Sequence, residues 1–193
     1  MLSARQITNQ ESTPYARAAD FCRIFAKDMD SLYQLSFLLT GDHSMAEKCF
    51  VRGLDDSRKG NAVFKEWARS WARRTIIQNA IQMIRPRPAD NRKSSFGSDW
   101  SAGAVTEPAE IAKIVELPAF ERFAFVMSVL ERYSDQECSL LLECTRGEVI
   151  AARTRVLQEI ARSAELHRKL LSIDPNEQPL RYNAGSLLQP KAA

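Results

Sequence analysis

The stretch SDQECSLLLECTRGEVIAARTRVL, residues 134–157, carries two helix-start signals. Ser134 is followed three residues later by Glu137, and Thr145 is followed three residues later by Glu148. Each pair forms a capping box, in which the hydroxyl accepts a hydrogen bond from the third helical amide and the glutamate accepts one from the amide of the capping residue. The stretch therefore predicts two consecutive helices joined by a tight connection.

Apolar residues on both sides of this connection have helical spacing. The residues concerned are Cys138, Leu141 and Leu142 in the first helix, and Val149, Ala152, Val156 and Ile160 in the second. A short helix, a tight turn and a second capped helix predict a helix-turn-helix, whose second helix enters the major groove in DNA-binding proteins. An ordinary αα-hairpin of an all-α protein has the same pattern, so this stretch alone leaves both interpretations open.

The composition of the chain is that of an ordinary globular protein. Its 193 residues are 45% hydrophobic and 26% charged, with a net charge of +3 and seven glycines. Few glycines and the absence of regular strand alternation favour an all-α fold.

The cysteines and histidines are too scattered to predict a metal site. They are Cys22, Cys49, Cys138, Cys144, His43 and His167. We expect reduced thiols, no metal, no cofactor and a cytoplasmic protein. No signal peptide or membrane span is expected, because no segment has the required apolar run. No catalytic pair, carboxylate cluster or phosphate loop is apparent, so we expect no enzyme.

Helical patterns also occupy the N-terminal part of the chain. Pro14 is placed to open a first helix, and Gly41 is placed to end a second. Asp42 or Ser44 is expected to cap a third helix. The polar residues 55–61 (DDSRKGN) predict a loop after it.

The longest expected helix runs from about residue 62 to residue 85. Its apolar stripe assigns Trp67 and Trp71 to the core. Between residues 58 and 93 there are ten basic residues and two acidic ones. A basic surface on one side of a helix is typical of proteins that bind polyanions. The alternative is a solvated helix face followed by a charged linker.

Proline, serine and glycine interrupt the helical pattern after residue 85. The predicted parts are a first helical domain (14–85), a flexible linker (86–107), a second domain with the helix-turn-helix (108–170) and a disordered tail (171–193). The predicted fold is therefore all-α, with two small helical domains joined by a linker. Phe96 and Trp100 are isolated aromatic residues within that linker.

This order of parts resembles the sigma factors of the extracytoplasmic-function group, which have two helical domains joined by a flexible linker. In the first domain, the similar segments are SLYQLSFLLTGD (31–42), Ala46-Glu47 and F-x-x-W-x-x-x-W-A-R (64–73). In the second, they are Leu117-Pro118 and the spaced set Glu137, Leu141, Leu142, Thr145, Gly147, Val149 and Arg155. By this resemblance the first domain is similar to sigma region 2 and the second to sigma region 4.

The resemblance implies a transcription initiation protein that binds core RNA polymerase and promoter DNA. An anti-sigma regulator is a further partner that it suggests. In the first domain, the residues that would bind a separated promoter strand are Arg69, Arg73, Arg74 and Gln78. In the recognition helix, the residues that would contact duplex DNA are Arg146, Arg153, Thr154 and Arg155.

The helix that corresponds to the family's polymerase-docking helix departs from the family pattern. Its positions here are Glu47, Lys48, Val51 and Arg52, so that cations replace two expected carboxylates. If the polymerase surface is basic at this point, like charges oppose docking.

The recognition helix and its turn also depart from the pattern. Ile150 and Ala152 stand at positions that are basic in the family, and Glu143 stands at the glycine of the turn. A non-glycine residue there must adopt a left-handed backbone conformation if the turn is unchanged. The alternative function is therefore a degenerate sigma-like regulatory or interaction protein that has lost polymerase docking.

Overall fold

The computed structural model describes residues 13–60, 62–88 and 109–172, and this part of the chain is all-α. Its elements are α1 (Ala18–Lys27), α2 (Met29–Thr40), α3 (His43–Lys59), η1 (Lys65–Trp67), α4 (Ala68–Ile84), α5 (Ala109–Val115), α6 (Ala119–Phe125), η2 (Val126–Leu130), α7 (Asp135–Leu142) and α8 (Arg146–Ser172). By their contacts the residues form two compact units, Met1–Val156 and Leu157–Ala193. Among the described helices, none has the length and apolar character that a membrane crossing requires.

Both predicted capping boxes are present. The Ser134 amide donates to the Glu137 carboxylate (2.9 Å), and the Glu137 amide donates to the Ser134 hydroxyl (3.2 Å). Thr145 and Glu148 form the same pair of bonds, at 2.8 and 3.2 Å. Between them Glu143 has a φ of 53°, the left-handed conformation expected for this turn. The helix starts are thus confirmed, whereas a DNA-reading role for α7 and α8 stays a prediction.

Two predictions for the N-terminal helices are wrong because of one extended contact. Pro14 does not open a helix: its carbonyl accepts from the Lys65 amide (2.9 Å), and Tyr15 forms an antiparallel bridge with Phe64. Since this bridge holds both segments extended, α1 begins only at Ala18 and α4 only at Ala68.

The predicted loop over residues 55–61 is also wrong, because α3 continues to Lys59. Buried hydrogen bonds hold this last part of α3 against α4. The hydroxyls of Ser57 and Thr75 lie 2.8 Å apart, and the Asn79 amide donates to Asp56 (2.7 Å). Tertiary contacts therefore extend a helix through a sequence that is polar enough to predict a loop.

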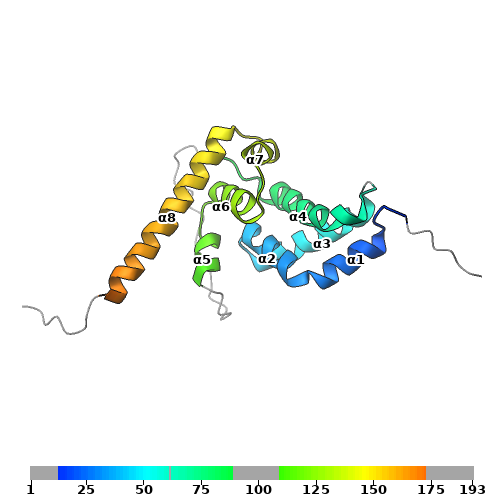
Figure 1. The fold of residues 1–193 in the computed structure, drawn as a ribbon, viewed down its shortest axis with the longest axis horizontal. Helices are drawn as coiled ribbons and strands as arrows, with labels where there is room; N and C mark the ends of the chain where they lie inside the picture. The colour runs from blue at the N-terminus through cyan, green and yellow to red at the C-terminus, as the bar shows by residue number, and fades with distance from the viewer. Residues whose placement is uncertain (1–12, 61, 89–108, 173–193) are drawn as a thin grey trace, which may run out of the picture. The chain divides into compact units, whose positions relative to one another are not determined.

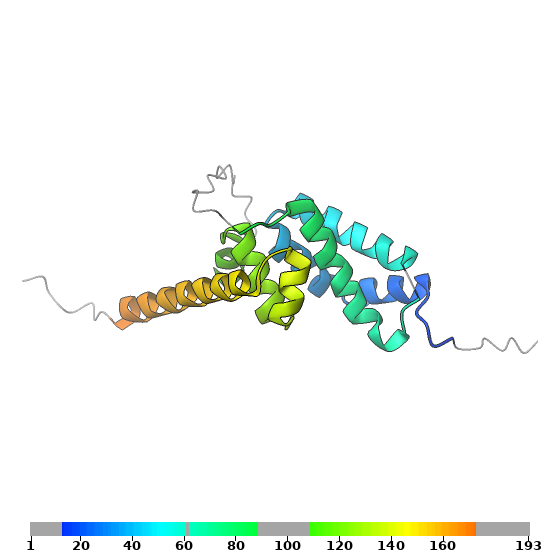
Figure 2. The same ribbon diagram turned by 90° about the horizontal axis from the view of Figure 1, so that it is seen from above.

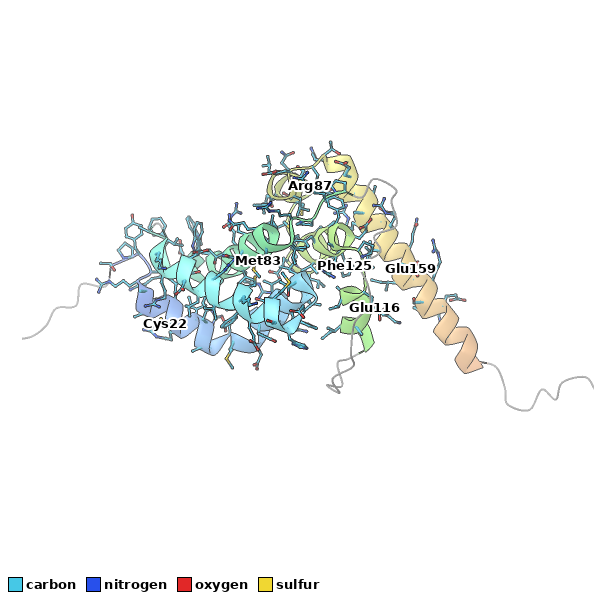
Figure 3. The ribbon with its side chains drawn as sticks, turned by 180° about the vertical axis from the view of Figure 1, so that it is seen from behind. Cys22, Met83, Arg87, Glu116, Phe125 and Glu159 are labelled. Carbon is cyan, nitrogen blue, oxygen red and sulfur yellow. The ribbon has the colours of Figure 1, made fainter. Side chains whose placement is uncertain are left out.

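One continuous apolar core joins the helices that precede and follow the predicted linker. Its buried residues from α2 and α4 include Leu35, Leu39 and Ile76, and those from the later elements include Phe123, Met127 and Val149. α6 packs against α2, and α7 packs against α4 (Figure 1, Figure 2). Met83 of α4 and Phe125 of α6, labelled in Figure 3, belong to the same core. The division by contacts accordingly falls within α8 rather than at residues 86–107.

A buried arginine ties the later helices to the end of α2. Arg122 donates to the carbonyl oxygens of Val115 (2.7 Å), Leu117 (3.3 Å) and Thr40 (3.3 Å). Thr40 is the last residue of α2, where a cation is favourable because helix carbonyls carry partial negative charge. Gly41 follows with a φ of 74°, and a Cβ there would lie 2.9 Å from Arg122 Nη1. Burial lowers the pKa of Arg122.

The remaining predicted parts lie largely outside the described residues. These are most of the linker, with Phe96 and Trp100, and nearly all of the tail after residue 171.

Candidate nucleic-acid interface

Three aromatic side chains form an exposed cluster where α4 begins. The rings of Tyr15 and Phe64 stack at 4.8 Å, and those of Phe64 and Trp67 meet edge to face at 5.3 Å. All three residues are exposed, and Trp67 keeps 59% of its surface accessible. Exposed aromatic faces are the groups on which unpaired nucleic-acid bases stack.

The assignment of Trp67 to the core is therefore wrong. The prediction continued the helical stripe back to residue 62, but Trp67 lies in the 3₁₀ turn η1, and α4 begins one residue later. The different turn geometry takes Trp67 out of the apolar stripe of α4. Trp71, one turn further on, is half-buried and packs against the small cluster of Phe21, Val63 and Ala68.

A cleft of about 500 Å³ lies next to this aromatic cluster. Phe64, Trp67, Trp71 and Arg74 line it from the start of α4, whereas Arg132 and Tyr133 line it from the turn between η2 and α7. Its volume is in the range of pockets that hold small ligands. The cleft thus combines flat aromatic surface with two guanidinium groups.

An acidic and a phenolic group also line the cleft. Glu137 also lines the cleft, and hydrogen bonds from the amide and hydroxyl of Ser134 lower its pKa, so its carboxylate stays ionised and offsets one of the two arginine charges. Burial raises the pKa of Tyr133, although Arg74 beside its hydroxyl opposes this. Tyr133 consequently stays neutral and keeps a hydroxyl that can donate.

The predicted strand-binding residues of α4 have different surroundings. Arg74 lines the cleft. Arg69 is exposed and pairs with Asp28 at 3.2 Å. Arg73 donates to both carboxylate oxygens of Glu131 and to the Ser31 hydroxyl, and the hydrogen bond to Glu131 raises its pKa. Gln78 is half-buried and does not line the cleft.

The predicted residues of the recognition helix are mostly engaged within the molecule. Arg153 forms an ion pair with Asp135, and Arg155 pairs with Glu121 at 2.9 Å. The Thr154 hydroxyl donates to the Ile150 carbonyl (2.8 Å). Among the residues that the structure describes, no carboxylate pairs with Arg146, which is exposed.

The predicted polymerase-binding residues lie on the exposed side of α3. They are Glu47, Lys48, Val51 and Arg52. Val51 lies one helical turn after Glu47, and Arg52 lies one helical turn after Lys48. Val51 exposes 56% of its surface. Within the described ranges neither Lys48 nor Arg52 has a carboxylate partner. This face is therefore accessible, with Val51 beside one acidic and two basic side chains.

Sequence reasoning missed four of the candidate site residues: Phe64, Arg132, Tyr133, and Trp67, which it assigned to the core. A left-handed φ of 58° at Arg132 is rare for a non-glycine residue, but the sequence around it gives no signal of this.

Two buried cysteines have no apparent chemical role. Burial raises the pKa of Cys49 and of Cys138 to about 11, so both thiols remain protonated near neutral pH. In the described part of the chain, no three Cys, His, Asp or Glu residues are grouped as metal ligands would be.

Comparison with known proteins found no family model that matches the chain and no matching curated protein.

Proposed function

We propose that this chain is a sigma-factor-like transcription initiation protein that binds core RNA polymerase and promoter DNA in the cytoplasm. The observation that supports this most is the cleft at the start of α4. It provides the aromatic faces and the cations that a separated DNA strand requires. Its lining residues Phe64, Trp67, Ser70 and Trp71 belong to the segment, residues 64–73, that resembles the strand-binding domain of the sigma family.

In this proposal an unpaired base stacks on Trp67, while Arg74 and Arg132 contact the flanking phosphates. Stacking on an aromatic side chain contributes roughly 1–3 kcal/mol per base. Duplex DNA keeps its bases stacked inside the helix, so the cleft should prefer single strands. The recognition helix would add phosphate contacts through Arg146, whose charge no carboxylate of the described residues offsets.

A second candidate function is that of a sigma-like regulatory or interaction protein that has lost polymerase docking. Two observations favour it: Lys48 and Arg52 flank the exposed Val51 on α3, and Arg153 and Arg155 are held by carboxylates. A surface of this charge fits an acidic partner better than the basic docking surface considered above.

Polymerase capture separates the two functions. We would incubate the full chain with bacterial core RNA polymerase at low and moderate salt and score a stoichiometric complex. The double variant Lys48→Glu/Arg52→Glu should strengthen capture if α3 docks on a basic surface. The matched control is Lys59→Glu, at an exposed position at the end of the same helix.

Capture by the parent chain that survives moderate salt supports the initiation protein. No capture of either the parent or the double variant, with both folded and helical, contradicts it and leaves the interaction protein. The DNA part is tested by anisotropy with labelled single strands and duplexes, where the initiation protein should bind single strands more tightly.

A further inference from the structure

We propose that Arg132 and Tyr133 complete the strand-binding site on α4, so that a bound single strand holds the later helices against the earlier ones. This inference rests on the proposed function and extends it. If the inference is correct, the strand binds only when the later helices are packed against α4. A binding site formed by α4 alone would bind the strand whether or not the later helices are packed against it.

The cleft is built from two segments that are distant in the sequence. One wall consists of η1 and the first turns of α4, with Trp67 and Arg74, and the other of Arg132 and Tyr133. Arg74 also lies beside the Tyr133 hydroxyl. A ligand that fills the cleft therefore contacts residues from both sides of the predicted linker.

The second wall is fixed in place by contacts on either side of Arg132. Glu131, whose side chain is 9% exposed, binds Arg73 of α4 through both carboxylate oxygens. The Tyr133 amide donates to the Met127 carbonyl (2.9 Å). Between these two anchors Arg132 adopts its left-handed conformation. Unfavourable conformations of this kind persist where surrounding contacts determine them, and they are enriched at ligand sites.

The chemistry of the two walls selects a single strand of nucleic acid. Arg74 and Arg132 supply positive charge from opposite walls, and these two charges exceed the single negative charge of Glu137, the only carboxylate among the cleft residues that the structure describes. Trp67 offers an exposed ring for a base. An acidic peptide would satisfy the arginines but would leave this ring without a flat partner.

Weakening the ion pair between Arg73 and Glu131 tests the inference, because the two possible sites predict opposite changes in strand affinity. If the packed form binds the strand, weakening this pair should weaken strand binding, because the second wall is lost more often. If Arg73 itself bound phosphate, as a site on α4 alone predicts, Glu131 would compete with the strand. Removing the Glu131 charge would then strengthen binding.

The first variant is Arg132→Gly, and the matched control is Arg85→Gly. Arg85 is also an exposed arginine with a left-handed backbone, at a φ of 51°, but it does not line the cleft. Both substitutions remove one cation and relieve the same backbone strain. Any difference between them in strand binding therefore reports on the cleft.

The experiment measures the affinity of the full chain for a fluorescein-labelled oligothymidine by anisotropy, as a function of salt. Arg132→Gly should bind about tenfold or more weakly, because a charge-assisted contact is lost. Its slope of log affinity against log salt should become shallower by about 0.7. Arg85→Gly should change the affinity by less than about threefold.

The second variant, Glu131→Gln, leaves the cleft residues in place. We expect about fivefold weaker binding with an unchanged salt slope, because this change acts on the packed form and not on a phosphate contact. Equal or tighter binding by Glu131→Gln, or equal affinities for Arg132→Gly and Arg85→Gly, would overturn the inference while leaving the proposed function standing. If the parent chain binds no oligothymidine, the inference and the DNA part of the proposed function both fail.

Discussion

The start of α4 and the start of α8 were both predicted to bind DNA through arginines, yet the two surfaces differ in what those arginines contact. At α4, Arg69 and Arg73 are paired with Asp28 and Glu131. Arg74 lies in a cleft beside exposed aromatic rings. At α8, Arg153 and Arg155 are paired with Asp135 and Glu121. Each surface therefore has both paired and unpaired arginines, and what distinguishes α4 is the aromatic cluster beside Arg74.

The largest expected effect concerns the core that both surfaces share. Phe123→Ala should lower the free energy of unfolding by about 3–5 kcal/mol, because the cavity left by a buried phenylalanine removes contacts to both groups of helices. Unfolding in urea, followed by circular dichroism and by tryptophan fluorescence, should show one coincident transition at a lower midpoint.

The control is Val129→Ala, at an exposed position of η2, which should cost less than about 0.5 kcal/mol. If Phe123→Ala instead separated the two signals into different transitions, the surfaces would belong to independent domains and could be compared one at a time.

The next effect tests whether the aromatic cluster makes the α4 surface, and not the α8 surface, bind single strands. Trp67→Ala should weaken single-strand binding by about 1–3 kcal/mol, or roughly 5- to 150-fold, because one stacked base loses its partner. Ile150→Ala, which truncates an exposed apolar residue on α8, should leave single-strand binding unchanged. Anisotropy with the same labelled strand measures both, and equal losses would contradict the distinction.

A smaller effect is expected when an arginine of α8 is released from its carboxylate partner. Glu121→Gln removes the carboxylate that holds Arg155, so Arg155 becomes free to contact phosphate. Duplex binding should strengthen about threefold, and its salt slope should steepen by about 0.9, as for one added phosphate contact. The control Glu47→Gln makes the same change of charge on α3 and should change neither the duplex affinity nor its salt slope. An unchanged salt slope for Glu121→Gln would show that Arg155 of α8 does not contact DNA.

The smallest effect concerns the capping boxes at the starts of α7 and α8. Hydrogen bonds from Ser134 lower the pKa of Glu137, and those from Thr145 lower the pKa of Glu148. A carboxyl group with a lowered folded-state pKa adds stability above its unfolded pKa of about 4.3 and loses it as the pH falls through the folded value. Below about pH 5, therefore, the melting temperature should fall less steeply in Glu137→Gln/Glu148→Gln than in the parent.

Melting curves from pH 6 to about pH 3, the window in which unfolded carboxyl groups titrate, measure this difference. The control is Glu66→Gln, at an exposed position of η1. Parallel curves for the parent and the double variant would show that the caps contribute no measurable pH dependence.

Local signals in the sequence predicted well, because they depend on residues a few positions apart. Both capping boxes and the cap by Asp42, one of the two candidates, follow from neighbouring residues alone. The left-handed Glu143 was expected from the resemblance, in which a glycine occupies this position of the turn. Trp67 was misplaced because a bridge between Tyr15 and Phe64, far apart in the sequence, delays the start of α4. A local pattern carries no information about such a contact.

The candidate site was predictable only in part, for the same reason. Arg74 was among the expected strand-binding residues, whereas Arg132 and Tyr133 come from another segment and join the cleft through tertiary packing. Nor can spacing reveal that Arg73 is bound by Glu131. The pairing of charges, unlike the placement of helices, is decided by the folded arrangement.

The shared core has a consequence for the way the chain folds as it is synthesised. Proteins are made from the N-terminus, and domains generally fold as units when their residues have emerged. Here the last residue of α2, Thr40, receives a hydrogen bond from Arg122, and Leu39 of the same helix belongs to a core that also contains Val149. The earlier helices thus cannot complete their core until α8 has begun to leave the ribosome. During that interval they expose apolar surface, so the nascent chain should be a better chaperone substrate than the finished protein.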